Sequence, residues 1–330
     1  MADEQALREE VLRRRCERTL GFLFELVEVL ETPEAHRDLL RIHLEEGRRQ
    51  TEELPQLACV QLPLLVFGAL AGDEAPAVPL AAGCTLVYLG ADLIDNVADR
   101  ELPPAWAEHG EALASLAGTT LIAALPPLAL ARLDAPPAVR LALSELLARG
   151  LVEMSAGQHS DLAGAEAGDL AAARASVERK SGAEMALFAE SAALLAGASP
   201  ERCERFRAAG RSYGAAVQLA SDVHELSAQA GGNDLRNGRR TLPVAHALGR
   251  LQPTRRALLD GLLEGGDDPA LLAELLAETR SLAYTAVVVE VYRRRALAEL
   301  DALGLDGPYA QELRALVADA TLLAPETLPA

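Results

Sequence analysis

The chain has 330 residues, of which half are hydrophobic and 3% are aromatic, and its formal net charge is −18. This length allows one large domain or two medium ones, and the apolar content allows a sizeable core. The negative charge argues against nucleic acid and anionic membrane surfaces as partners.

Compartment and membrane contact can also be judged from the composition. Four scattered cysteines without a CxxC pair argue against a zinc or redox site and favour a reduced, cytoplasmic compartment. The acidic N-terminus, Met1–Glu4, lacks the apolar region of a signal peptide. The most apolar stretch, 57–71, is interrupted by Gln61 and Pro63, so we expect no stable membrane insertion.

Helical periodicity runs nearly from end to end and predicts an all-α, single-domain protein over residues 1–330. Residues 1–31 should contain an N-terminal helix, and residues 306–330 should form a loosely ordered tail. Ser199 followed by Pro200 is typical of a helix start. The expected helices cover residues 4–31, 34–52, 55–71, 76–99, 108–131, 136–162, 168–195, 199–228, 241–251, 252–264, 268–279 and 281–304.

A first acidic cluster lies near the end of the helix expected over 76–99. Asp92, Asp95 and Asp99 are spaced i, i+3 and i+7 and therefore share one helical face. Like charges on one face repel by about 0.2–0.5 kcal/mol per neighbouring pair, and a bound cation removes that cost. Mg²⁺ suits such a face because it takes oxygen ligands and shares its shell with phosphates. The alternative is a solvated acidic face, since the chain has 49 acids.

A second acidic face is expected on the helix over 199–228, where Gln218, Asp222 and Glu225 lie on one side. A basic segment that contains Arg239 follows it. Between the two clusters lies the single lysine of the chain, Lys180. A lysine ammonium is a compact phosphate-binding charge whose shape arginine does not reproduce.

Together these segments resemble the trans-isoprenyl diphosphate synthases, also called polyprenyl synthetases, over roughly residues 60–250. That family has a first DDxxD motif, a GQxxDL segment, a Lys-Ser/Thr-Gly segment, a QxxDDxxD motif and a DLxxGKxTLP segment. The corresponding segments occur here in the same order, as Asp95–Asp99, Gly157–Leu162, Lys180–Gly182, Gln218–Glu225 and Asp234–Pro243.

The resemblance implies an all-α isoprenoid synthase bundle with a central active-site cavity, usually as a homodimer. In this fold the two acidic helices face each other and bind two or three Mg²⁺ ions with an allylic prenyl diphosphate substrate. By position, the metal ligands would be Asp95, Asp99, Asp222 and Glu225, assisted by Asp92, Asn96 and Ser221. Lys180, Arg239 and Arg100 would stabilise the departing diphosphate, and Gln218, Gln158 and Asp161 would line the site. For Gln158 and Asp161 the alternative is a buried polar contact between helices.

The departures from the family pattern concern both its metal-binding motifs and its second substrate. Asn96 and Ser221 stand where the motifs have aspartates, and Arg239 replaces a lysine. The early GGKRxRP segment, which holds isopentenyl diphosphate in the family, would fall near residues 54–60, where no basic residue occurs. Arg48 and Arg49 lie earlier in the chain. A second diphosphate needs several cationic donors, and the sequence does not supply them at the expected places.

Small residues precede the first motif, where the family places bulky residues that cap the growing chain. Gly90 and Ala91 therefore predict a deep pocket, with Tyr88 as its floor, which suits a C15 or longer prenyl tail. The alternative is that these small residues allow close helix packing.

The leading hypothesis from the sequence is a Mg²⁺-dependent class I terpene synthase, a lyase on a prenyl synthase scaffold, with Asp95, Asp99, Asp222 and Lys180 as its catalytic residues. It would ionise one allylic diphosphate by stabilising the leaving-group charge in a dry cavity. The alternatives are a chain-elongating trans-prenyltransferase, a prenyltransferase that acts on a non-isoprenoid acceptor, and a non-catalytic partner subunit.

Overall fold

The computed structural model describes residues 2–54, 56–163, 169–227, 240–266 and 268–322, and these residues form helices and connecting segments without a strand. The chain divides into two compact units. The first comprises Met1–Leu147, Phe188–Cys203 and Leu305–Leu313, and the second comprises Ala148–Leu187, Glu204–Gly304 and Arg314–Ala330. The predicted all-α class is confirmed, and the single domain stays a prediction.

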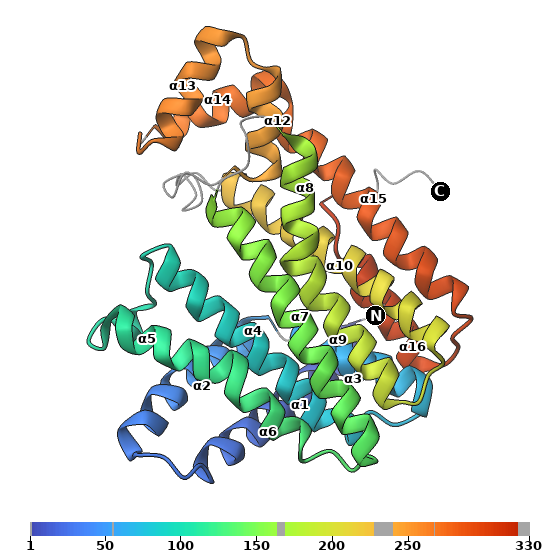
Figure 1. Ribbon diagram of the computed structural model, residues 1–330. Helices are drawn as coiled ribbons and strands as arrows, with labels where there is room; N and C mark the ends of the chain where they lie inside the picture. Colours follow the sequence, from blue (N-terminus) through green and yellow to red (C-terminus); the bar gives the residue numbers. More distant parts are fainter. Residues whose placement is uncertain (1, 55, 164–168, 228–239, 267, 323–330) are drawn as a thin grey trace. The chain divides into compact units, whose positions relative to one another are not determined.

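The first unit is built around helix α4 (Val78–Ala98), which packs against α1, α3, α5 and α6 (Figure 1). Its core includes Leu86, Leu89 and Leu93 of α4 together with Trp106, all fully buried. Helix α2 adds Leu40 and Leu44. The other elements are α1 (Ala2–Glu28), α2 (Glu34–Glu53), α3 (Ala58–Ala71), η1 (Ala75–Ala77), η2 (Pro104–Trp106), α5 (Gly110–Thr119), η3 (Thr120–Ala124), α6 (Leu125–Leu130) and parts of α7, α9, α10 and α16.

The second unit contains the long helix α10 (Pro200–Ser227) and a cluster around α12 (Leu242–Arg250), which contacts α8, α13, α14 and α15 (Figure 1). Val244 and Leu248 of α12 pack with Leu259 and Leu275 in its core. The remaining helices are α7 (Pro137–Ala163), α8 (Leu170–Arg179), α9 (Ser181–Leu195), α13 (Pro253–Leu263), α14 (Pro269–Thr279), α15 (Ser281–Ala302) and α16 (Pro308–Ala318), of which α7, α9 and α16 belong to it in part.

Side-chain caps mark the starts of α8, α10 and α14. The Arg202 N–H donates to Ser199 Oγ at 3.4 Å, which confirms the helix start predicted at Ser199–Pro200. Asp169 accepts from the backbone N–H groups of Ala171 and Ala172, each at 2.9 Å, and so caps α8. Such caps satisfy N–H groups that have no partner within the helix.

Three elements differ from the sequence prediction. The helix expected over 168–195 is broken at Lys180 into α8 and α9. The helix expected over 108–131 contains a π-helical segment, η3. The expectation of a loosely ordered tail from residue 306 was wrong for Pro308–Ala318, which forms α16 because Leu313 and Val317 find buried positions. Residues 323–330 lie outside the described part.

Two helical stretches of the described chain, Ala75–Ala98 and Gly110–Leu130, are long and apolar enough to cross a membrane, by length and composition only. A third exists if α2 and α3 are counted as one bent span. Within the protein, 72% of the apolar 18-residue window of the first stretch and 44% of that of the second is buried. The first stretch contains α4, so its apolar character also serves the core of the first unit. The absence of membrane insertion stays a prediction.

Candidate functional site

The first acidic cluster lies at the C-terminal end of α4 in the first unit. Asp92, Asp95 and Asn96 belong to the last two turns of the helix, and Asp99 is its C-terminal cap, with its N–H donating to Asp95 O at 2.9 Å. Arg100 follows in the left-handed region with φ 60° and an exposed side chain. The sequence therefore placed this cluster correctly at a helix end.

Asp92 is the most perturbed carboxylate of this cluster. Burial raises the pKa of Asp92 to about 6, and the neighbouring charges of Asp95 and Glu46 add to the increase. Hydrogen bonds from Asn96 Nδ2, at 3.3 Å, and from Gln50 oppose it. Glu46 and Gln50 come from α2 and were not selected from the sequence, because no local pattern connects them to α4.

The second acidic cluster lies on α10 in the second unit. Gln218 Nε2 donates to Asp222 Oδ1 at 2.9 Å, and Ser221 Oγ donates to Glu225 Oε1 at 3.4 Å. Asp222 is 3% exposed, whereas Ser221 and Glu225 are exposed. The predicted shared face therefore holds one buried and one solvated carboxylate.

Lys180 occupies the break between α8 and α9, with φ −89° and ψ −93°. The next residue, Ser181, donates from Oγ to Gln218 Oε1 at 2.7 Å. Because Gln218 also donates to Asp222, a hydrogen-bonded chain connects the break to the buried carboxylate. The sequence reasoning missed Ser181, although it lies inside the Lys-Ser-Gly segment that signalled the site.

The GQxxDL segment lies on α7 and approaches the same break. A Cβ atom at Gly157 would lie 2.7 Å from Arg179 C and from Lys180 N, so only glycine fits there without a shift. Gln158 is half-buried, and Asp161 belongs to the last turn of α7. Arg239 lies outside the described residues.

Gly90, one of the two small residues before the first motif, allows close helix packing. A Cβ atom at Gly90 would lie 2.7 Å from Ile122 N and from Ile122 Cβ in η3. Ala91 is half-buried, and Tyr88 packs against the core of the first unit. The geometry at Gly90 favours close packing, and the deep pocket stays a prediction.

No cation lies on the segment where the family holds isopentenyl diphosphate. Cys59, Val60 and Gln61 are buried, at no more than 1% exposure. The earlier arginines already have acidic partners on α2: Arg48 Nη1 lies 3.2 Å from Glu45 Oε2, and Arg49 pairs with Glu46.

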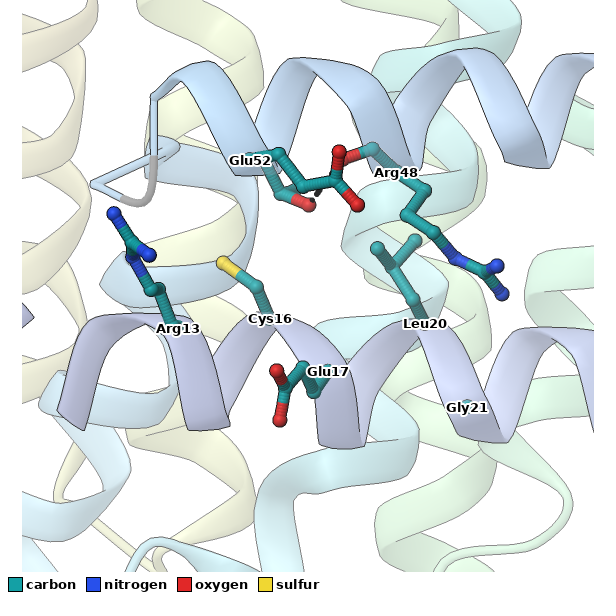
Figure 2. Close-up of a pocket in the computed structure, with 8 residues that line it drawn as sticks. Arg13, Cys16, Glu17, Leu20, Gly21, Arg48 and Glu52 are labelled. Atoms are coloured by element: carbon teal, nitrogen blue, oxygen red, sulfur yellow. Dashed lines mark hydrogen bonds between the residues drawn. The ribbon is translucent and has the colours of Figure 1, made fainter. Parts of the chain in front are cut away.

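A pocket of about 420 Å³ lies between α1 and α2 in the first unit (Figure 2). Arg13 and Arg48 lie at opposite ends of it, and Cys16 and Leu20 point into it from α1. Glu17 and Glu52 also line it, so the formal charges of its two arginines and two glutamates sum to zero. Of its lining residues, the sequence analysis considered only Arg48.

Mg²⁺ fits the donor chemistry of both clusters, since each offers carboxylate oxygens. The described residues contain no group of three or more His, Cys, Asp or Glu that could hold a metal ion. An ion at either cluster would therefore complete its shell with phosphate oxygens and water, as Mg²⁺ commonly does.

Comparisons with known proteins agree with these features. The family model for polyprenyl synthetases matches residues 85–279. The chain is 29% identical over 297 residues to a (2E,6E)-farnesyl diphosphate synthase of Mycobacterium bovis, covering 80% of this chain and 81% of that protein. It is 30% identical over 261 residues to a nonaprenyl diphosphate synthase of Mycobacterium tuberculosis, covering 74% and 76%.

Solved structures show the same fold. A geranylgeranyl pyrophosphate synthetase from Pyrococcus horikoshii superposes with a TM-score of 0.79 at 22% identity, covering 96% of this chain and 99% of that chain. A geranylgeranyl pyrophosphate synthase from Corynebacterium glutamicum, with a TM-score of 0.77 at 18% identity, was solved with isoprenyl diphosphate and magnesium and covers 95% and 98%.

The match of the family model extends over more than half of the chain, and the relatives cover most of it. The family acts on allylic prenyl diphosphates and uses Mg²⁺ with them. The chain therefore belongs to the polyprenyl synthetase family, as an enzyme of the prenyltransferase type.

Proposed function

We propose that this protein is a chain-elongating trans-prenyltransferase that joins an allylic prenyl diphosphate to isopentenyl diphosphate. The allylic C–O bond breaks, a new C–C bond forms, and diphosphate and a proton leave. The observation that carries the proposal is the chain of hydrogen bonds from Ser181, next to Lys180, through Gln218 to the buried Asp222. The named products of the relatives, farnesyl and nonaprenyl diphosphate, support elongation over cyclisation.

The residues of this chain would divide the work by charge. The Lys180 ammonium would donate to the departing diphosphate, and Arg100 and Arg239 would add positive charge to it. Bound Mg²⁺ would supply further charge stabilisation to the same leaving group. Gln218 would hold Asp222 in one orientation through its amide N–H. The proposed ion-binding residues are Asp92, Asp95, Asn96, Asp99, Ser221, Asp222 and Glu225, and the proposed substrate-lining residues are Tyr88, Ala91, Gln158, Asp161 and Gln218.

A second candidate is the terpene synthase of the sequence analysis, which ionises one allylic diphosphate and uses no isopentenyl diphosphate. One observation favours it: the segment near residues 54–60 carries no cation, and Cys59 and Val60 are buried. For a terpene synthase, the diphosphate would leave by the same Lys180-assisted step. The acceptor would then be an internal double bond, a base or water.

The product profile separates the two candidates. The purified protein is incubated with geranyl, farnesyl or geranylgeranyl diphosphate and Mg²⁺, with and without isopentenyl diphosphate. Elongation predicts longer diphosphates only when isopentenyl diphosphate is present. Hydrocarbon or alcohol products in its absence would favour the terpene synthase, and no turnover with no diphosphate binding would indicate a non-catalytic subunit.

Substitution of the acidic clusters tests the site itself. Asp95→Ala and Asp222→Ala should each lower turnover by at least about 10²-fold, since each removes charge stabilisation of the leaving group. Asp301→Ala is the control, because Asp301 is an exposed carboxylate paired with Arg314 at 3.0 Å. Unchanged turnover in Asp95→Ala or Asp222→Ala would remove that residue from the proposed site. The homodimer stays a prediction.

A further inference from the structure

Lys180 lies at the junction between α8 and α9, so the contacts that hold this junction also set the position of Lys180. A helix that ends leaves its last carbonyl groups without intrahelical partners. Here α8 ends at Arg179 and α9 begins at Ser181, so a single residue, Lys180, separates the two helices. The Lys180 N–H donates to Ser176 O at 2.9 Å, and the other carbonyl groups at the end of α8 can accept from side chains or water.

Arg211 of α10 reaches the end of α8. Its Nη1 donates to the backbone carbonyl of Glu178 at 3.0 Å and to Glu153 Oε1 at 2.7 Å. Its Nη2 donates to Glu153 Oε2 at 3.1 Å, so the guanidinium makes a bidentate ion pair with the Glu153 carboxylate. A fixed cation at a helix C-terminus also stabilises the helix dipole.

The side chain of Glu178 is held separately by α15. Tyr292, which is 5% exposed, donates from its hydroxyl to Glu178 Oε1 at 2.5 Å. Burial, together with the Glu178 carboxylate, raises the pKa of Tyr292, so its hydroxyl remains a donor at neutral pH. Glu178 is therefore fixed at its carbonyl by Arg211 and at its carboxylate by Tyr292.

Close backbone packing restricts the junction further. Gly157 of α7 leaves room for the Arg179–Lys180 peptide, and a Cβ atom at Gly182 would lie 3.1 Å from the Arg211 carbonyl oxygen. The junction is thus bounded by α7 and α10 at backbone distance. On the α9 side of the junction, hydrogen bonds connect Ser181 to Gln218 and Gln218 to Asp222. A shift of the junction would displace the ammonium and disturb the orientation of the buried carboxylate.

We propose that Arg211, held by Glu153, is a positioning residue that fixes the α8–α9 junction and through it the diphosphate-binding ammonium of Lys180. Tyr292 fixes the same junction by holding the Glu178 side chain. Neither residue touches the substrate in this scheme. The inference rests on the proposed role of Lys180 and goes beyond it, because it assigns a task to side chains that no motif marks.

The test compares Arg211→Met and Arg211→Lys with the matched control Arg205→Met. Arg205 lies on the same helix and pairs with Glu299 of α15 at 3.2 Å, away from the junction. Calorimetry measures the binding of inorganic diphosphate with Mg²⁺, and thermal unfolding reports stability. We expect about 10-fold weaker binding for Arg211→Met, a smaller loss for Arg211→Lys, and less than about 2-fold for Arg205→Met. If Arg211→Met fails to fold, Arg211→Lys carries the test.

A double-mutant cycle separates positioning from general destabilisation. If Arg211 acts through Lys180, Arg211→Met adds no further loss of diphosphate affinity in a Lys180→Met background. Additive losses, or equal behaviour of the Arg211 and Arg205 variants, would overturn the inference while leaving the proposed function intact. A wild-type protein that binds no diphosphate would remove both.

Discussion

At the scale of single residues, Arg100 combines a strained backbone with a proposed function. Its φ of 60° places a side-chain-bearing residue in a region that favours glycine, at a cost of about 1 kcal/mol. Its N–H closes the end of α4 on Val97 O at 3.1 Å.

Arg100→Gly should therefore raise the free energy of unfolding by about 0.5–1 kcal/mol and lower turnover. Arg280→Gly is the matched control, because Arg280 has φ 54° at the junction of α14 and α15. It should gain similar stability and keep full turnover. Urea unfolding and steady-state kinetics check both, and equal turnover in the two variants would exclude Arg100 from diphosphate binding.

Residue types could be predicted from the sequence more readily than residue environments. Asp92, Asp95 and Asp222 were selected because carboxylates at helical spacing are visible in one segment. The raised pKa of Asp92 comes mainly from burial, with the charges of Asp95 and of Glu46, on another helix, adding to it. The burial of Asp222 depends equally on packing. Such properties follow from tertiary structure, which a single sequence does not display.

At the scale of elements, helix ends set by local caps were predictable, and breaks set by packing were not. Ser199 marks the start of α10 within three residues of sequence. The break at Lys180 requires Gly157 on α7 and Gly214 on α10, because both helices approach its backbone. The apolar pattern on both sides of Lys180 continues without interruption, so it predicted one helix.

Gly214→Ala tests this packing. A methyl group at Gly214 would overlap the Ser181 carbonyl group, whose backbone cannot move aside cheaply. We expect a loss of about 2 kcal/mol or more in the free energy of unfolding, in the range of overpacked cores. Gly261→Ala on α13 is the control, since nothing lies within 4 Å of its Cβ position, and it should gain about 0.5–1 kcal/mol. Similar stabilities in chemical denaturation would contradict the close approach of α10 to the junction.

At the scale of the whole molecule, the order of motifs along the chain was sufficient to predict the family and its fold. No single motif was sufficient, because the first acidic cluster alone is also compatible with a solvated face. The sequence did not determine whether isopentenyl diphosphate is the acceptor, and the reason is physical. Binding a second diphosphate depends on cations brought together from several helices, and the burial of Cys59 and Val60 could not be predicted from their identity alone.

The stability of the protein should depend on pH through the buried His43 and the half-buried Asp92, whose effects have opposite signs. Burial lowers the pKa of His43 from 6.5 to about 4, so the folded state resists its protonation. Stability from His43 is complete above about pH 6.5 and is lost as the pH falls toward 4. Asp92 has a raised pKa of about 6, so its burial cost is present above pH 6 and disappears as the pH falls toward 3.8.

These two effects oppose each other between neutral and mildly acidic pH. As the pH falls from about 7.5 to about 5, protonation of His43 should lower the free energy of unfolding by about 2 kcal/mol, and protonation of Asp92 should raise it by about 1 kcal/mol. His43→Gln can keep the hydrogen bond to Leu89 O, which His43 Nε2 makes at 2.8 Å, and it removes the titration. Relative to wild type on acidification, His43→Gln should gain stability and Asp92→Asn should lose it. Urea unfolding in metal-free buffer at both pH values measures this, and parallel pH profiles for the three proteins would refute the assignment.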